Sequence, residues 1–279
     1  MYTVQERTIP KMTAQEKLYK SIEEGQHVCI GLDTDINKIP SFLLSNEDPV
    51  FQFNKIIIDN TIEYAAAYKL NFAFYEKEGL KGIQSLKKTI EYINDSVLVI
   101  GDAKRGDIGN TSEMYAHALY NYFKVDAATV NPYMGYDSVS PFLKYSDKIN
   151  FILALTSNPG ADDFEKLILD DHYYVYQKVI DKVNKWNIND NCGIVFGATQ
   201  LNELMSNIIS LSDIPILLPG VGAQGASLEE VVSTFHKNRI SKYLINSSRG
   251  IIYKNNSENF GLAARNELMN LNNIIKKGL

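Results

Sequence analysis

Eight short apolar segments that alternate with helical patterns along 279 residues predict an α/β protein of the (β/α)8 class, the TIM barrel. The segments are rich in Val, Ile and Leu and are continuously apolar, which is typical of parallel strands covered on both faces. Polar or charged residues follow nearly every segment, at the end where barrel enzymes carry their chemistry. A doubly wound open sheet is the alternative, because alternation alone does not require the strands to close.

The predicted strands are distributed through the whole sequence, and no Pro- or Ser-rich linker divides them. They cover residues 27–33, 67–72, 97–104, 127–132, 150–157, 192–199, 216–222 and 243–249. Three longer connections, 34–48, 133–148 and 158–190, are interpreted as additions to the barrel, the last long enough for an extra helix. We expect one domain over residues 1–279, with a helical extension at its N-terminus.

Helix signals lie between these segments. Thr13 and Glu16 form a capping-box pattern that begins a helix ending near Gly25. Residues 227–235 are also helical in character, with two glutamates in the first turn. A further helix is predicted by apolar residues at three- and four-residue spacing, namely Ile83, Leu86, Ile90 and Ile93.

The composition limits the classes of partner. Twenty-eight basic and 33 acidic side chains give a net charge of −5, the opposite of the balance usual for a nucleic-acid binder. A local cationic pocket still permits an anionic small substrate. The first residues lack the apolar core of a signal peptide, and no apolar run is long enough to span a bilayer. We therefore expect a cytoplasmic protein with no membrane partner.

The cysteines and histidines give little sign of special chemistry. Cys29 and Cys192 each lie in an apolar run and are interpreted as buried free thiols. The four histidines are scattered without the spacing of a zinc site, so no metal is expected.

The segment 102–107, DAKRGD, follows the third predicted strand. Residues two apart in a strand point to the same face, so Asp102 and Lys104 should project together, with Asp107 on the following loop. Neighbouring carboxylates favour the charged form of a lysine. The segment therefore predicts that Lys104 is a proton donor or cationic stabiliser rather than a Schiff-base lysine. A surface ion-pair cluster is the structural alternative.

Glycine-containing turns after the seventh and eighth strands predict a phosphate site, as is usual in these barrels. Residues 219–226, PGVGAQGA, match G-x-G-x-x-G. The motif lies late in the chain and lacks an acidic residue about 20 positions later, so we reject a dinucleotide fold. In SSRG at 247–250, Arg249 offers a planar fork for phosphate oxygens, and Gly250 lets the backbone approach closely.

Together these motifs resemble the orotidine 5'-phosphate decarboxylase family. DAKRGDIGNT at 102–111 is similar to its D-x-K-x-x-D-I signature and the threonine that follows. The long connections, and NPYMG at 131–135, resemble the longer bacterial form of the enzyme. The other matching segments, in family order, are LD at 32–33, YKLN at 68–71, TSNPGA at 156–161, PGVGAQG at 219–225 and SSRGI at 247–251.

The resemblance implies a cofactor-free conversion of orotidine 5'-monophosphate to uridine 5'-monophosphate and carbon dioxide in pyrimidine biosynthesis. Lys104 corresponds to the residue that protonates C6 of the pyrimidine after carbon dioxide leaves. Asp102 corresponds to the carboxylate that faces the substrate's own carboxylate and orders the lysine. Asp107, Ile108 and Thr111 correspond to a segment that enters the neighbouring subunit's site, which implies a homodimer with shared active sites.

Other correspondences concern the nucleoside part of the substrate. Asp33 and Lys69 match ribose contacts. Ser157 matches a pyrimidine contact, and Pro219 a residue near the ring. Asn158 departs from the family pattern, in which another polar residue, often histidine, follows the serine.

The phosphate end completes the predicted site. Gln224 and Arg249 match the phosphate grip, with Gly250 beside it. We expect the segment that begins at Gly222 and runs to residue 227 to close over the phosphate.

Two alternatives to the decarboxylase remain, one in the same superfamily and one in another functional class. A superfamily relative such as a hexulose-phosphate synthase would use the same carboxylates to hold Mg²⁺, and its activity would be sensitive to chelation. A non-catalytic sensor of a phosphate ligand is the second alternative, but it has no use for a lysine between two carboxylates.

Overall fold

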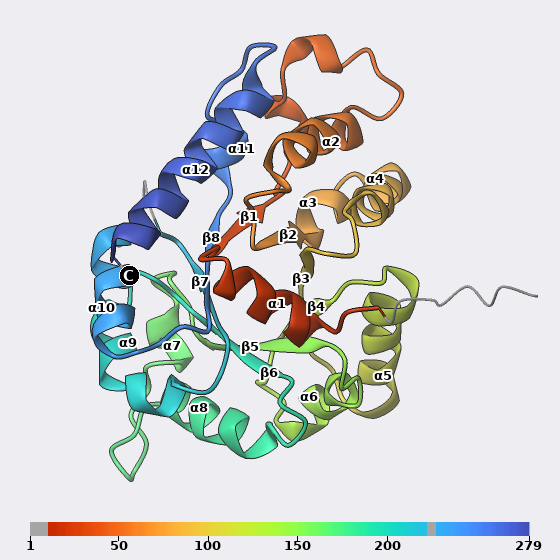
Figure 1. Cartoon of the computed structure of the whole chain (residues 1–279). Coiled ribbons are helices and arrows are strands. Elements are labelled where there is room, and N and C mark those ends of the chain that lie inside the picture. The colour runs from red at the N-terminus through yellow and green to blue at the C-terminus, as the bar shows by residue number, and fades with distance from the viewer. Residues whose placement is uncertain (1–10, 222–226, 279) are drawn as a thin grey trace, which may run out of the picture.

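The computed structural model describes residues 11–221 and 227–278, whose eight strands close into one parallel barrel (Figure 1). Each strand pairs with the next, and β8 pairs with β1 through Val28 and Ile245. This closure confirms the predicted (β/α)8 class and excludes the doubly wound sheet. The strands are β1 (Val28–Gly31), β2 (Ala67–Asn71), β3 (Leu98–Arg105), β4 (Ala127–Val130), β5 (Ile149–Leu155), β6 (Cys192–Phe196), β7 (Ile216–Pro219) and β8 (Tyr243–Ser247).

Helices surround the strands, as Figure 1 shows. They are α1 (Ala14–Glu23), α2 (Pro49–Thr61), α3 (Phe72–Glu76), α4 (Gly79–Tyr92), α5 (Gly109–His117), α6 (Tyr136–Leu143), α7 (Ala161–Phe164), α8 (Val175–Trp186), α9 (Leu201–Ser206), α10 (Leu228–Lys237), α11 (Arg249–Ile252) and α12 (Phe260–Gly278). Short turns of helix are η1 (Ile36–Lys38), η2 (Ser41–Leu43), η3 (Ala118–Tyr122) and η4 (Ile208–Leu211).

The predicted helix starts are confirmed. The Thr13 and Glu16 side chains form both bonds of the capping box, and Gly25 follows α1 with a φ of 70°. Ser227 caps α10 by accepting a hydrogen bond from the Glu230 backbone N–H.

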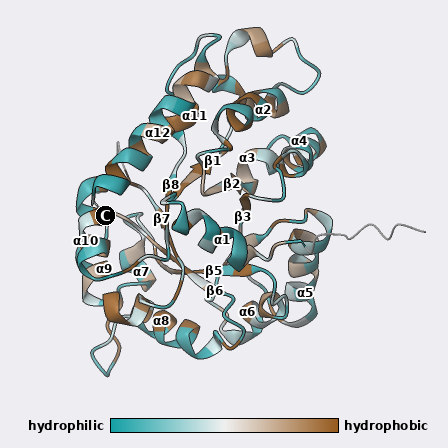
Figure 2. Ribbon diagram, in the orientation of Figure 1, coloured by the Kyte–Doolittle hydropathy of each residue, from teal (hydrophilic) through white to brown (hydrophobic). Residues whose placement is uncertain are grey.

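Apolar side chains fill the barrel, and α1 closes its amino-terminal end. In Figure 2, β1 and β3 are coloured as hydrophobic, while α12 and α8 carry both kinds of residue. The Ala14 N–H donates to the carbonyl of Asp147 just before β5, at 2.9 Å, which fixes α1 across that end. Ala14 and Leu18 of α1 pack in one cluster with the apolar residues of the barrel interior, which are Cys29, Ala67, Leu98, Ile100, Ala127, Ile149, Phe151, Val195, Leu217 and Leu244. The carboxyl ends of the strands are thereby left for chemistry.

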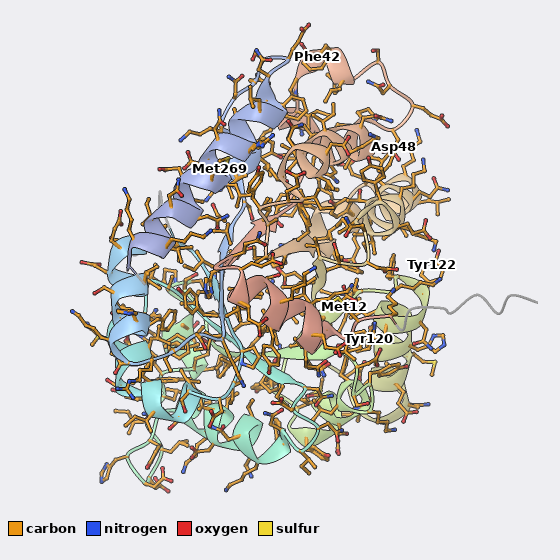
Figure 3. All side chains as sticks on the ribbon, in the orientation of Figure 1. Met12, Phe42, Asp48, Tyr120, Tyr122 and Met269 are labelled. Atoms are coloured by element: carbon orange, nitrogen blue, oxygen red, sulfur yellow. The ribbon has the colours of Figure 1, made fainter. Side chains whose placement is uncertain are left out.

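The connection 34–48 packs on the barrel's outer helices. Figure 3 labels Phe42 and Asp48 at two points of this connection, beside α12 and α2. The Phe42 ring lies 6.4 Å from that of Phe260, and Asp48 accepts hydrogen bonds from the Phe51 N–H and the Ser85 hydroxyl. The connection 158–190 contains α7 as the expected extra helix, followed by α8.

Both cysteines are buried free thiols, as predicted. Burial raises the pKa of each thiol to about 12, so neither is a nucleophile at neutral pH. Within the described ranges, no helix is both long enough and apolar enough to cross a membrane.

Candidate active site

A row of alternating charges crosses the carboxyl ends of β1, β2 and β3, which are neighbours in Figure 1. Lys69 Nζ lies 3.5 Å from Asp33 Oδ1 and 2.8 Å from Asp102 Oδ2. Lys104 Nζ lies 2.6 Å from Asp102 Oδ1. Because Asn71 of β2 pairs with Asp102 of β3, Lys69 faces the same side of the barrel within reach of Asp102. Four residues predicted from the sequence thus meet in one place.

The opposite charges in this row stabilise one another. Burial disfavours the charge of Asp102, but the ammonium groups of Lys69 and Lys104 hold the pKa of Asp102 well below its usual value. Burial also opposes the charge of Lys69, yet Asp102 and Asp33 raise the pKa of Lys69 above its usual value. Asp102 is therefore an anion and Lys69 a cation at neutral pH, although both are buried.

From the sequence we expected the Lys104 ammonium to lie between the carboxylates of Asp102 and Asp107. Within one chain this expectation is wrong. In the described part of the chain, Lys104 pairs with Asp102 but not with Asp107, whose Oδ1 accepts the Ile108 N–H at 2.8 Å. The reason is that β3 ends at Arg105 and the loop leads into α5. It is Asp102 that lies between two lysines. The exposed side chains of Ile108 and Thr111 belong to the same turn.

The end of β3 is irregular where it carries Lys104. Gly101 pairs with Ala128 of β4, but Arg105 pairs with Val130, so β3 contains extra residues between these two points. Lys104 itself has a φ of 47°, in the left-handed region that residues with a Cβ rarely adopt. Alternation along a regular strand is therefore only part of the reason why Asp102 and Lys104 meet.

Asp33 is fixed from the opposite side of the row by the residue that directly follows β8. The Ser248 hydroxyl donates to Asp33 Oδ2 at 2.8 Å. A Cβ on Gly31 would lie 1.8 Å from Ser248 Oγ, so only glycine at that position of β1 leaves room for the Ser248 side chain to reach Asp33. The Tyr253 hydroxyl accepts the N–H of Asp35 at 2.7 Å, which holds the loop that follows.

Ser157 lies where β5, β6 and β7 end. A Cβ on Gly197 would approach the Ser157 backbone N to 2.8 Å, and one on Gly220 would lie 3.7 Å from its Oγ. Glu165, which follows α7, accepts hydrogen bonds from the Thr156 N–H at 2.6 Å and from the Thr156 hydroxyl. The connection 158–190 therefore holds the loop that presents Ser157 next to the end of β7.

The predicted phosphate end is only partly described. Pro219 is the last residue of β7. Strand β8 ends at Ser247, two residues earlier than predicted, and Arg249 and Gly250 open α11 as exposed residues. Gly222 and Gln224 lie outside the described residues.

Two contributors to the site were missed from the sequence, and both are hydroxyl groups. Ser248 bonds Asp33, and Thr129 of β4 donates to Asp102 Oδ1 at 2.8 Å. Thr129 is the one polar residue of the strand AATV, and Ser248 directly precedes Arg249. Thr129 could have been found from this signal, since a polar side chain that faces the barrel interior needs a partner.

The geometry of the site bears on metal binding as well. Among the described residues, no three His, Cys, Asp or Glu side chains are grouped so as to hold an ion. Both oxygens of Asp102 accept hydrogen bonds from lysine ammonium groups.

Barrel and charge row together define a class: an enzyme that uses paired lysines and carboxylates at the strand carboxyl ends. Comparison with known proteins refines this class. Residues 26–261 match the family described as "Orotidine 5'-phosphate decarboxylase / HUMPS family". The orotidine 5'-phosphate decarboxylase of Porphyromonas gingivalis is 46% identical over 259 residues, covering 92% of this chain and 94% of that protein.

Other relatives agree. The orotidine 5'-phosphate decarboxylase of Christiangramia forsetii is 49% identical over 252 residues, covering 89% of this chain and 92% of the relative. The solved structure of Leishmania donovani OMP decarboxylase is similar with a TM-score of 0.79 and 32% identity, covering 95% and 99% of the two chains. The chain belongs to the orotidine 5'-phosphate decarboxylase family, and it is accordingly a carboxy-lyase.

Proposed function

We propose that this chain converts orotidine 5'-monophosphate to uridine 5'-monophosphate and carbon dioxide, with the charge row as its reaction centre. The observation that carries the proposal is the buried Asp102 carboxylate held between the ammonium groups of Lys69 and Lys104. Relatives that are 46% and 49% identical over most of the chain bear the name of this activity.

Lys104 is proposed as the proton donor. Breaking the bond between C6 and the carboxylate carbon leaves the electron pair on C6, where the ring offers no ready electron sink. The Lys104 ammonium stabilises this developing charge and then transfers a proton to C6. The neutral amine regains a proton from water, because 49% of the Lys104 side chain is exposed. The step requires only side chains of the protein.

The remaining site residues are proposed to bind the rest of the substrate. Asp33 and Lys69 contact the ribose, and Ser157 the pyrimidine, with Pro219 beside the ring. The position of Ser157 near Gly220 supports this division, because it puts the pyrimidine contact next to the end of β7. The phosphate contacts are Gln224, Arg249, Gly222 and Gly250. Binding there, remote from C6, contributes energy that orders the reacting part.

A homodimer with shared sites is the second part of the proposal. Asp107, Ile108 and Thr111 lie at the start of α5, outside their own chain's charge row, and in the proposed dimer they enter the second subunit's site. Ile108 is 56% exposed, and the nearby β4–α6 loop presents Tyr133 at 80% exposure. Exposed apolar side chains of this size, gathered at the mouth of the barrel, favour a protein interface. Each subunit of the proposed dimer contributes one barrel domain.

The activity is tested directly with the purified chain and orotidine 5'-monophosphate. The expected result is loss of the orotate absorbance, with one carbon dioxide released for each uridine 5'-monophosphate formed, before and after treatment with EDTA. A folded protein without turnover would refute the proposal. An unchanged orotate absorbance, together with an activity on a sugar phosphate that EDTA abolishes and Mg²⁺ restores, would instead support the synthase type of relative.

The shared site is tested by complementation. Asp107→Asn and Lys104→Ala are each expected to lose most activity. After the two are dissociated and reassembled together, about one quarter of wild-type activity should return, since half of random dimers hold one intact site of two. No recovery from folded, mixed dimers would count against shared sites.

A further inference from the structure

Thr129 is a buried polar residue that the proposed mechanism does not use. It lies in β4 with 1% of its surface exposed. Its neighbours Ala128 and Val130 pack in the outer core between strands and helices, whereas Ala127 packs in the barrel interior. By the alternation of a strand, Thr129 also faces the interior, one layer above Ala127 and at the level of the charge row.

The Thr129 hydroxyl joins the backbone of one site residue to the side chain of another. Its Oγ1 accepts the backbone N–H of Lys104 at 2.9 Å and donates to Asp102 Oδ1 at 2.8 Å. A hydroxyl has one proton, so accepting the Lys104 N–H leaves that proton for the carboxylate. Because Lys104 Nζ bonds the same Asp102 oxygen at 2.6 Å, the three residues form a closed ring of hydrogen bonds.

The backbone of Lys104 explains why such a bond is needed. The pairing of β3 with β4 shifts between Gly101 and Arg105, so the Lys104 N–H is bonded by a side chain where the ladder is interrupted. With a φ of 47°, Lys104 also occupies a conformation that is unfavourable for a residue with a Cβ. A conformation of this kind persists only where surrounding contacts fix it, and it is common at active sites.

We propose that Thr129 is a positioning residue for the decarboxylation, fixing the Lys104 backbone and the Asp102 carboxylate at once. This inference rests on the proposed role of Lys104 as proton donor. When Lys104 has given its proton to C6, its ion pair with Asp102 weakens. Asp102 then keeps its bonds to Thr129 and to Lys69, the latter at 2.8 Å, so the carboxylate stays in place until Lys104 is protonated again.

The test compares two substitutions of similar size. Thr129→Val replaces the hydroxyl by a methyl group, whereas Thr129→Ser keeps the hydroxyl and removes a methyl group. Loss of a hydrogen bond to a charged group predicts that Thr129→Val lowers kcat by about 10- to 100-fold, with KM nearly unchanged. Thr129→Ser should stay close to wild type. If Thr129→Val fails to fold, Thr129→Cys, whose thiol donates only weakly, replaces it in the comparison.

A double variant separates positioning from a general structural defect. If Thr129 acts through Lys104, then Thr129→Val should add little to the loss already caused by Lys104→Ala. The inference is overturned by a wild-type kcat in Thr129→Val, by equal losses in the Ser and Val variants, or by a full additional loss in the double variant. A Lys104→Ala protein as active as wild type would refute the function itself, whatever the Thr129 variants did.

Discussion

Two buried lysine–aspartate pairs lie at opposite ends of the barrel. At the amino-terminal end, Lys17 of α1 lies 2.7 Å from Asp126, with 2% and 5% of the side chains exposed. At the carboxyl end, Lys69 lies 2.8 Å from Asp102, with 5% and 7% exposed. Distance and burial hardly distinguish the two pairs, so a buried ion pair alone does not identify an active site.

The surroundings of the two pairs differ instead. Asp126 also accepts the Val99 N–H at 3.0 Å, and its second cation, Lys148, lies 4.0 Å away with only 14% of its side chain exposed, so the protein itself satisfies this pair beneath α1. Asp102 binds a second cation, Lys104, whose side chain is half exposed at the mouth of the barrel. The amino-terminal pair is closed within the protein, and the carboxyl-end pair extends toward a substrate. Substitutions at the first should change stability, and substitutions at the second should change turnover.

The largest effect is expected at Lys104. Lys104→Ala removes both the stabilising charge and the proton donor, and kcat should fall by about 10³-fold or more while the protein stays folded. Steady-state kinetics and thermal unfolding measure the two quantities. Lys88→Ala, which removes a half-exposed lysine paired with Asp48, is the matched control and should keep full activity. Equal activity in both variants would show that Lys104 is not the proton donor and that the charge row is not the reaction centre.

The next effect concerns the amino-terminal pair. Lys17→Met leaves the buried Asp126 carboxylate with only Lys148, 4.0 Å away, as a cation, which should lower the free energy of unfolding by about 3 kcal/mol. Lys17→Met with Asp126→Asn should recover part of this loss, because the amide carbonyl can still accept the Val99 N–H. Denaturant titration at fixed protein concentration measures both. A large fall in kcat of the folded Lys17→Met protein would show that the two ends are coupled.

A smaller effect is expected where Ser248 crosses β1 to reach Asp33. Ser248→Ala should lower kcat/KM by up to about tenfold, mainly through KM, because it frees the carboxylate proposed to bind the ribose. Gly31→Ala should give a similar defect, since its Cβ would lie 1.8 Å from Ser248 Oγ. Steady-state kinetics of the two variants measure kcat and KM. Wild-type KM values in both variants would show that Ser248 does not position Asp33.

The sequence predicted the barrel and most of the charge row for a common reason. Continuous apolar runs and the residues that end them are local features, so Asp33, Lys69, Asp102 and Lys104 could be assigned to strand ends one at a time. The partners of Asp102 could not be predicted in this way, because they depend on the register of β2, β3 and β4 and on the bulge at Lys104. For the same reason the sequence suggested Asp107, which follows Lys104 in the same segment, as a second carboxylate beside Lys104, and it did not predict that Lys69 would be the second cation beside Asp102.

The smallest expected effect is on the pH dependence of stability, and it concerns His27 at the amino-terminal end of the barrel. His27, just before β1, stacks on the Tyr243 ring at 4.1 Å, and burial lowers the pKa of its imidazole from 6.5. Below about pH 6.5 the unfolded chain therefore binds a proton at His27 that the folded chain excludes. The contribution of the neutral His27 to the free energy of unfolding is complete above that pH. It is lost as the pH falls, by up to about 1.4 kcal/mol per pH unit. His27→Gln should reduce the difference in the free energy of unfolding between pH 7.5 and pH 5.5, measured by denaturant titration, by at most about 1.4 kcal/mol. Its kcat should match wild type at both pH values, since His27 lies at the end opposite the charge row; an unchanged pH dependence of unfolding would show that His27 is not the group responsible.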